Sequence, residues 1–428
     1  MKKLIPITLV LILLITAAIE PIRAQNEISA FSTASVQYPT ELTFNLVAES
    51  SADITQIFLR YRIGKVTNVK VTTVVQPDFE PAPTVETSWT WNMKKTLGSL
   101  PPGAEVQYSW RIQDATGYEI ETAWATVKYD DHRYLWDSLT AGDITLFWYE
   151  GEMSFAQALL DSADDALEIL ARDAGVYLEQ AVVVYIYANS DDLRDALLYP
   201  PEWIGGIAFT QYGIVAIGVS TNNLSWGKRA IAHELAHLVT HQMTSNPYND
   251  IPTWLDEGIS LYAEGDLRFD LQSTLDKAIS EDSLISVQSI SSSFPSDTYE
   301  AMLSYAESFS IVEFLLQQYD REKMLQLLNV FKQGSSYEDA LLEVYGFDTS
   351  GLDNLWRLSL GLEPRQSPPG TTPQYTATPE PDTGLFGCQS ASGTTSHSSS
   401  TFFVVIGFLF IPCTTEIIRL SAWRIRKR

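Results

Sequence analysis

Cysteine is nearly absent from this sequence, with two residues among 428. Two cysteines exclude a disulfide framework and a cysteine-rich zinc site. Basic residues are also scarce: 28 Lys and Arg stand against 53 Asp and Glu, which gives a net charge of −25. This acidity argues against nucleic acid as a partner, because phosphate binding requires clustered Lys and Arg. The hydrophobic fraction of 45% still supplies enough apolar material for a buried core.

Both ends of the chain carry membrane-directed patterns. Residues 1–24 combine two lysines, an apolar run and a small residue at Ala24, which predicts a cleavable signal peptide, with an uncleaved anchor as the alternative. Residues 401–418 are mostly apolar and long enough for a transmembrane helix. The basic run 419–428 predicts a cytoplasmic tail, and therefore a single-pass protein of the cell membrane with its ectodomain outside. This end is also typical of a bacterial sorting signal, whose removal would release or re-anchor the protein.

Three regions are expected between these ends. Residues 25–130 contain short β-rich runs separated by turn residues, which predicts an all-β, immunoglobulin-like sandwich with a spacing, docking or adhesion role. In residues 131–362, strand-like runs at 181–188, 205–209 and 213–219 are followed by long stretches of helical periodicity, which predicts an α+β domain. Residues 363–400 are rich in Pro, Thr, Ser and Gly and read as a stalk.

Histidine is rare but clustered, since three of the five histidines are His233, His237 and His241. The first two form an H-E-x-x-H pattern with Glu234 between them. Residues four apart lie on one face of a helix, so the two imidazoles can converge on one zinc ion. His241 lies about 12 Å from His233 along the helix axis, too far for the same metal. We expect it to lie at the surface or beside a ligand.

A second acidic motif follows at 254–258, Trp-Leu-Asp-Glu-Gly. The intervening turn residues allow the first helix to end near 246–249, and Pro252 predicts the start of a second, antiparallel helix. Glu257 would then face the two histidines as the third metal ligand. Three protein ligands with an open fourth position are the coordination of a catalytic zinc. The strand-like run 213–219 is a further candidate, for binding an extended peptide by strand addition.

The paired motifs H-E-L-A-H at 233–237 and W-L-D-E-G at 254–258 resemble the gluzincin metallopeptidases, specifically the peptidase MA-like domains of secreted bacterial proteins. The resemblance covers roughly residues 135–360 and implies a zincin-like fold with a small sheet and a helical lobe. It implies one Zn²⁺ per chain, a peptide or protein substrate, and Glu234 as the general base toward a metal-activated water. Gluzincins usually add an oxyanion-stabilising side chain, for which Tyr305 is the candidate and Tyr262 the second choice.

Two departures from the family pattern bear on these expectations. Position 261 is Leu, where thermolysin-type enzymes carry an Asp that orients a zinc histidine, so the orienting partner must lie elsewhere. No G-x-M-E-N segment precedes the zinc helix, which favours an endopeptidase over an aminopeptidase. The sequence thus predicts a membrane-anchored extracytoplasmic zinc metallopeptidase. The alternative is a catalytically inert surface adhesion or peptide-binding protein that keeps the peptidase fold. The oligomeric state, the substrate and the cleavage specificity stay open.

Overall fold

The computed structural model describes residues 27–64, 71–94, 100–200, 204–365 and 404–406. The predicted signal peptide 1–24, almost all of the stalk 363–400 and the basic tail 419–428 lie outside these residues. No helix among the described residues is long and apolar enough to cross a membrane.

The N-terminal region is all-β, as predicted. Its core strand is β2, whose 23 residues carry two stretches of alternating buried and exposed side chains. The first half of β2 pairs with β1 and β4, and the second half with β3 and β5, all antiparallel. The register shifts between Glu49 and Ile54, where the two halves meet. The strands are β1 (Ser29–Gln37), β2 (Glu41–Ile63), β3 (Thr73–Val75), β4 (Ala82–Asn92), β5 (Ala104–Asp114), β6 (Glu119–Glu121) and β7 (Ala125–Tyr129).

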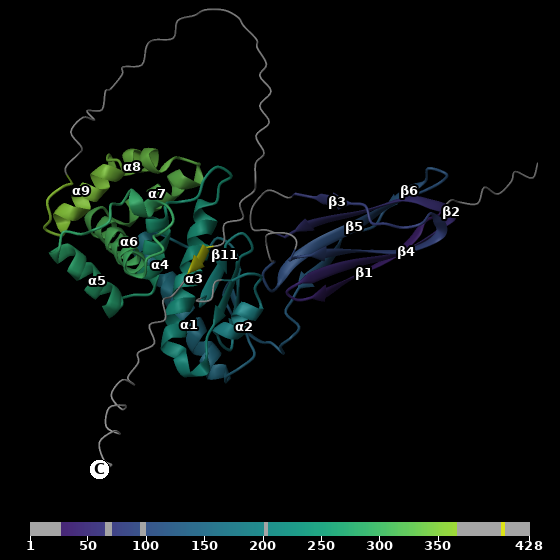
Figure 1. Ribbon diagram of the computed structural model, residues 1–428, viewed down its shortest axis with the longest axis horizontal. Helices are drawn as coiled ribbons and strands as arrows, with labels where there is room; N and C mark the ends of the chain where they lie inside the picture. The colour runs from purple at the N-terminus through teal and green to yellow at the C-terminus, as the bar shows by residue number, and fades with distance from the viewer. Residues whose placement is uncertain (1–26, 65–70, 95–99, 201–203, 366–403, 407–428) are drawn as a thin grey trace, which may run out of the picture.

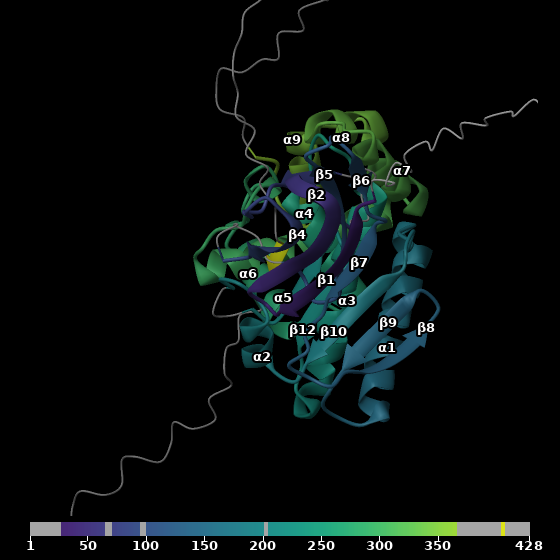
Figure 2. The ribbon, with the colours of Figure 1, turned by 90° about the vertical axis from the view of Figure 1, so that its right-hand side faces the viewer.

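A second, mixed sheet lies between the all-β region and the helices (Figures 1 and 2). Its strand order is β13-β11-β12-β10-β9-β8, and β10 runs parallel to both β9 and β12. The predicted strands 181–188, 205–209 and 213–219 correspond to β10, β11 and β12. The strands are β8 (Asp137–Ala141), β9 (Ile144–Trp148), β10 (Val182–Tyr187), β11 (Gly206–Phe209), β12 (Ile214–Gly218) and β13 (Val404–Ile406).

Both faces of this sheet are buried, so its strands read as continuous apolar runs. Alternate residues divide between two cores: Val215 and Ile217 face the core shared with the helices. Ile214 and Ala216 face the core shared with the all-β region. The mixed sheet is therefore the layer that joins the two halves of the molecule.

Helices account for most of the remaining described residues and confirm the α+β prediction. Short π- and 3-10 turns occur at 170–174, 221–223 and 289–291. Helices α1 and α3 cover the mixed sheet, and α4 to α9 form a lobe at the upper left of Figure 1. The helices are α1 (Met153–Ile169), α2 (Ser190–Asp195), α3 (Leu224–Thr244), α4 (Thr253–Ala263), α5 (Phe269–Ser280), α6 (Thr298–Gln318), α7 (Arg321–Lys332), α8 (Tyr337–Tyr345) and α9 (Thr349–Ser359).

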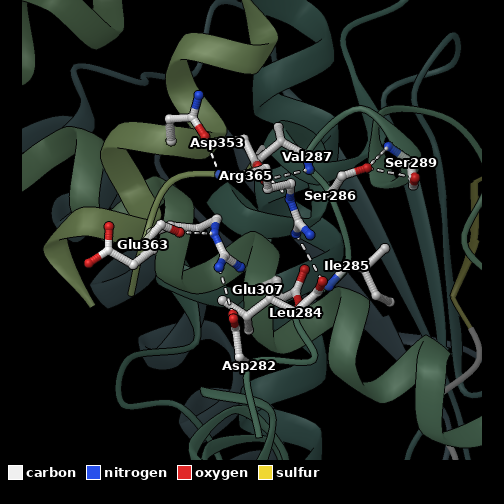
Figure 3. Close-up of polar contacts among 12 residues, drawn as sticks. Asp282, Leu284, Ile285, Ser286, Val287, Ser289, Glu307, Asp353, Glu363 and Arg365 are labelled. Atoms are coloured by element: carbon white, nitrogen blue, oxygen red, sulfur yellow. Dashed lines mark hydrogen bonds and ion pairs between the residues drawn. The ribbon is translucent and has the colours of Figure 1, made fainter. Parts of the chain in front are cut away.

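The end of the helical lobe is fixed by a polar cluster (Figure 3). Arg365 bonds the Asp353 carboxylate at 2.6 Å and the Leu284 carbonyl at 2.9 Å. The other oxygen of Asp353 accepts the backbone N–H of Val287. The buried Glu307 of α6 accepts the N–H of Ile285 at 2.8 Å. These bonds tie the segment between α5 and α6 to α6 and α9.

A transmembrane helix was predicted at 401–418, but the three residues of this range that the structure describes, Val404–Ile406, form a strand. Val404–Ile406 form β13, which pairs antiparallel with β11. β-Branched residues favour the extended chain, and without β13 the strand β11 would be the edge of the sheet, with backbone groups open to pairing. The remainder of 401–418 lies outside the described residues.

Candidate active site

Helix α3 carries the H-E-x-x-H motif on a face directed away from its packing side. Ile231, Leu235, Leu238 and Val239 are fully buried in the helical core, as their positions around the helix predict. The helix runs to Thr244, close to the predicted end. His233 and His237 project together, with ring centroids 4.8 Å apart.

Helix α4 brings the third group of the site to the two imidazoles. It begins at Thr253 with Pro252 as its N-cap, as the sequence predicts. Glu257 Oε2 lies 3.4 Å from His233 Nε2 and 3.6 Å from His237 Nε2. One ligand atom from each of the three residues lies within 4.8 Å of the others, and all three residues are buried. Neither Glu257 Oε2 nor His237 Nε2 makes a hydrogen bond within the described part of the chain.

This donor set fits a metal ion. Two imidazole nitrogens and one carboxylate oxygen are the ligands that zinc takes in catalytic sites. Burial of such polar atoms without hydrogen bonds costs free energy, and coordination of a cation would offset that cost.

A buried carboxylate orients each imidazole from behind. His233 Nδ1 lies 2.7 Å from Glu264 Oε1, and His237 Nδ1 lies 2.8 Å from Asp256 Oδ1. Each Nδ1–H donates to its carboxylate, which leaves the Nε2 lone pair directed at Glu257. Although burial disfavours the charged form, Glu257 and Glu264 raise the pKa of the metal-free His233 to about 10.

These two carboxylates supply the orienting role that Leu261 cannot, and sequence reasoning did not assign it to them. A signal was present for Glu264, which lies seven residues after Glu257. Seven residues are two helical turns, so both side chains lie on one face of α4. A signal was also present for Asp256. His237 and His241 are four residues apart on α3, so one carboxylate can contact both.

Glu234 lies between the metal-binding group and strand β11 of the mixed sheet. Its carboxylate is buried, and neither oxygen makes a hydrogen bond within the described residues. Burial raises the pKa of Glu234 to about 7, although His233 and His237 act in the opposite direction. The backbone of β11 passes so close that a Cβ on Gly206 would lie 2.5 Å from Glu234 Oε1. Glycine at this position therefore makes room for the carboxylate.

The two tyrosine candidates point to different places. Tyr262 donates its hydroxyl to Asp173 Oδ2 at 3.3 Å. Tyr305 of α6 is half-buried beneath Phe294. Burial raises the pKa of Tyr305 well above its usual range, and the nearby carboxylates of Glu257 and Glu234 add to this effect. Of the two tyrosines, Tyr305 is therefore the one whose hydroxyl is influenced by the carboxylates of the site.

Helix α6 reaches the site because α4 contains a glycine at the crossing of the two helices. A Cβ on Gly258 would lie 2.4 Å from the carbonyl oxygen of Ser308 and 2.6 Å from Val312 Cγ2. Its absence allows the backbones of α4 and α6 to touch, one residue away from Glu257.

The prediction that residues 213–219 bind an extended peptide by strand addition is wrong. Residues 213–219 form β12, which is paired on both sides, with β10 and with β11. Its backbone groups are already used, so it cannot accept another strand. The strand beside Glu234 is β11, and its outer side pairs with β13.

Comparison with known proteins places the site inside a known family region. A family model described as Peptidase MA superfamily matches residues 162–361. No curated protein matches the chain. Among solved structures, an M1 zinc metallopeptidase from Deinococcus radiodurans is similar over 80% of this chain and 94% of its own, at 13% identity and a TM-score of 0.34. Wild-type OgpA from Akkermansia muciniphila is similar over 25% of this chain and 28% of its own, at 12% identity and a TM-score of 0.19.

Proposed function

Residues 162–361 of this chain belong to the Peptidase MA superfamily, and from this premise we propose that the protein is a zinc metallopeptidase. The observation that carries the proposal is the buried convergence of His233, His237 and Glu257 beside the carboxylate of Glu234. A purely structural metal site would have no use for Glu234, because its carboxylate is buried without a hydrogen-bond partner among the described residues.

In this proposal, His233 Nε2, His237 Nε2 and Glu257 Oε2 hold the zinc ion. When bound, zinc supplies Lewis-acid chemistry that polarises a carbonyl and acidifies a water molecule. Glu234 accepts a proton from the attacking water on its carboxylate and donates that proton to the leaving amine. Its burial beside Gly206 keeps bulk water away from this transfer. The Tyr305 hydroxyl donates a hydrogen bond to the oxyanion of the scissile carbonyl.

We propose endopeptidase activity for the same site. Recognition of a free amino terminus requires a carboxylate close to the metal-binding group, and the chain that passes beside Glu234 is β11 with the residues before it. Ile204 and Gly205 and the four residues of β11, Gly-Ile-Ala-Phe, contain no acidic side chain. Peptides blocked by N-acetylation should therefore be cleaved as fast as free ones. Hydrolysis confined to aminoacyl amides with a free amine would contradict this part of the proposal.

The localisation is a further part of the proposal. Residues 1–24 support export, and the apolar and basic residues of 401–428 support a C-terminal anchor. In the anchored protein, Val404–Ile406 would leave their pairing with β11 and enter the membrane. We propose that residues 25–400 lie outside the cell membrane. Protease added to intact cells should then remove the ectodomain and leave a short C-terminal fragment with the membrane. Full protection of the chain would contradict this topology.

The central test compares the wild-type protein with Glu234→Gln. The substitution keeps the size and shape of the side chain and removes its ability to carry the proton. We expect both proteins to bind one zinc ion, and we expect hydrolysis to fall by at least about 100-fold in the variant, within the range for general acid–base groups. A wild-type protein that binds zinc but cleaves nothing in a broad peptide library would instead support the inert adhesion or peptide-binding alternative.

A further inference from the structure

His241 is the third histidine of helix α3, and the proposed function gives it no role. It follows His237 by one turn of α3, and its Nε2 lies 3.1 Å from Asp256 Oδ2. The other oxygen of the same carboxylate lies 2.8 Å from His237 Nδ1. Asp256 is thus shared between two histidines, of which one faces the metal position and the other does not.

The carboxylate of Asp256 is nearly enclosed, with 9% of its side chain exposed, whereas His241 retains 17%. Because a buried carboxylate loses its hydration, each oxygen needs a donor from the protein. His237 supplies one donor and His241 supplies the other. Without His241, Oδ2 would lack this partner, and the carboxylate would lower its free energy by rotating toward solvent or another donor. Such a rotation would release the Nδ1–H of His237.

The other metal-facing histidine has a less complete support. Glu264 bonds His233 through Oε1, while its Oε2 has Arg229 only at 3.6 Å, an ion pair without a hydrogen bond. The orientation of Glu264 therefore depends on one short contact. Asp256 is held through both oxygens, so the ring of His237 is the more firmly fixed of the two imidazoles.

We infer that His241 is a positioning residue of the metal centre, which holds Asp256 so that Asp256 fixes the ring and tautomer of His237. The inference rests on the proposed function, because it assigns His237 to zinc. His241 touches neither the metal position nor the substrate, so its effect reaches zinc only through Asp256. Loss of the His241 N–H should weaken zinc binding while the protein remains folded.

The experiment uses three substitutions that differ in where they place a donor. His241→Gln puts an amide N–H about where Nε2 lies, His241→Asn ends one bond shorter, and His241→Leu has no donor. Zinc dissociation constants are measured by chelator competition on the full chain, and thermal unfolding is measured on the metal-free proteins. The absorption spectrum of the cobalt-substituted proteins reports the ligand geometry. His132→Leu is the matched control, because His132 is exposed and far from the motif in sequence.

We expect zinc to bind about tenfold more weakly in His241→Leu and His241→Asn, the lower end of the range for partners of metal ligands. The cobalt spectrum should change in the same two variants. His241→Gln and His132→Leu should match the wild type in both measurements. If His241→Leu fails to fold, the comparison of Gln with Asn carries the same test, because both are amides.

Unchanged zinc affinity and an unchanged cobalt spectrum in the Asn and Leu variants would overturn the role of His241. The same holds if those variants lose only thermal stability in the metal-free state, since His241 would then serve the fold alone. A wild-type protein that binds no zinc would overturn the proposed function itself. The two failures are therefore distinguishable.

Discussion

At Gly206, the strand β11 passes beside the carboxylate of Glu234, and the missing side chain sets their distance. A Cβ there would lie 2.5 Å from Oε1 and 3.0 Å from both Cδ and Cγ of Glu234. Real contacts are longer, so a methyl group must displace the carboxylate or the strand. The backbone of β11 is also held by pairing with β12, which leaves the Glu234 side chain as the part that moves.

We therefore predict that Gly206→Ala impairs catalysis without impairing metal binding. A displacement of about 1 Å in a catalytic group can cost about 100-fold in rate, and we expect a loss of this order in kcat/KM. Zinc affinity should be unchanged, because the atoms nearest to the added Cβ all belong to Glu234. Peptide hydrolysis and chelator competition measure the two effects. An alanine variant with full activity would show that Glu234 does not need its present position.

The sequence predicts part of the residue-scale arrangement. The spacing of His233 and His237 requires only one regular helix, and the structure brings Glu257 to both of them as expected. The spacing of Glu264 and Asp256 made them possible partners of the histidines, but their roles depend on how α4 is rotated against α3, and the spacing alone does not determine that rotation. The choice between Tyr305 and Tyr262 depends likewise on α6, whose approach is set by the contact at Gly258.

At the scale of elements, the buried Glu307 links α6 to the segment that follows α5. Its Oε1 accepts the N–H of Ile285, and its Oε2 is buried without a hydrogen-bond partner among the described residues. Burial raises the pKa of Glu307 from 4.5 to about 8, although the Ile285 N–H opposes the shift. The side chain is therefore protonated in the folded protein at neutral pH.

This protonation predicts a pH dependence of stability. Between pH 4.5 and about 8, Glu307 releases its proton in the unfolded chain and keeps it in the folded one. The free energy of unfolding should thus fall as pH rises through this window, by up to about 1.4 kcal/mol per unit, and level off above it. Glu307→Gln should remove this component. Denaturant unfolding at pH 5, 6.5 and 8 measures it, and equal slopes in both proteins would contradict the prediction.

Whether a segment forms a helix or a strand was easier to predict from the sequence than the order of the strands in the sheet. The strands at β10, β11 and β12 and the helix at α3 follow from short apolar runs and from helical periodicity. The order of strands is a non-local property, so the sequence could not tell that β12 is internal and that β11, which pairs with β13 on its outer side, is the strand beside Glu234. The strands β1, β8 and β9 were not predicted at all, because their alternation is short or weakly apolar.

At the scale of the whole molecule, the prediction of an α+β, zincin-like domain preceded by an all-β sandwich is confirmed. The sequence did not reveal that the two regions share a core. Tyr38 of the all-β region donates its hydroxyl to the Ala196 carbonyl at 2.9 Å. Tyr187 of β10 donates to the buried Asp131, which also binds Arg133. These contacts join segments about 60 to 160 residues apart in sequence, beyond the reach of any local pattern.

This shared core gives the all-β region a structural role that a free spacer would not have. The face of the mixed sheet opposite α1 and α3 belongs to the same apolar cluster as the core of the all-β region, together with Leu193 of α2. On that face, Ile207, Phe209, Ile214 and Ala216 are all at most 4% exposed. Tyr185 and Tyr187 of β10 contact the all-β region directly, at Gly103, Asp130 and Asp131. Removal of residues 27–131 would uncover the apolar surface around these two tyrosines, and exposed patches of this kind promote association.

We therefore predict that a variant beginning at residue 132 will not remain a soluble monomer. Each large apolar side chain that loses its cover forfeits about 1.5–3 kcal/mol, so the mixed sheet should also become less stable. Light scattering, size-exclusion chromatography and dye binding to apolar surface measure the outcome. A monomeric shortened chain with the melting temperature of the full protein would show instead that the all-β region is an independent module.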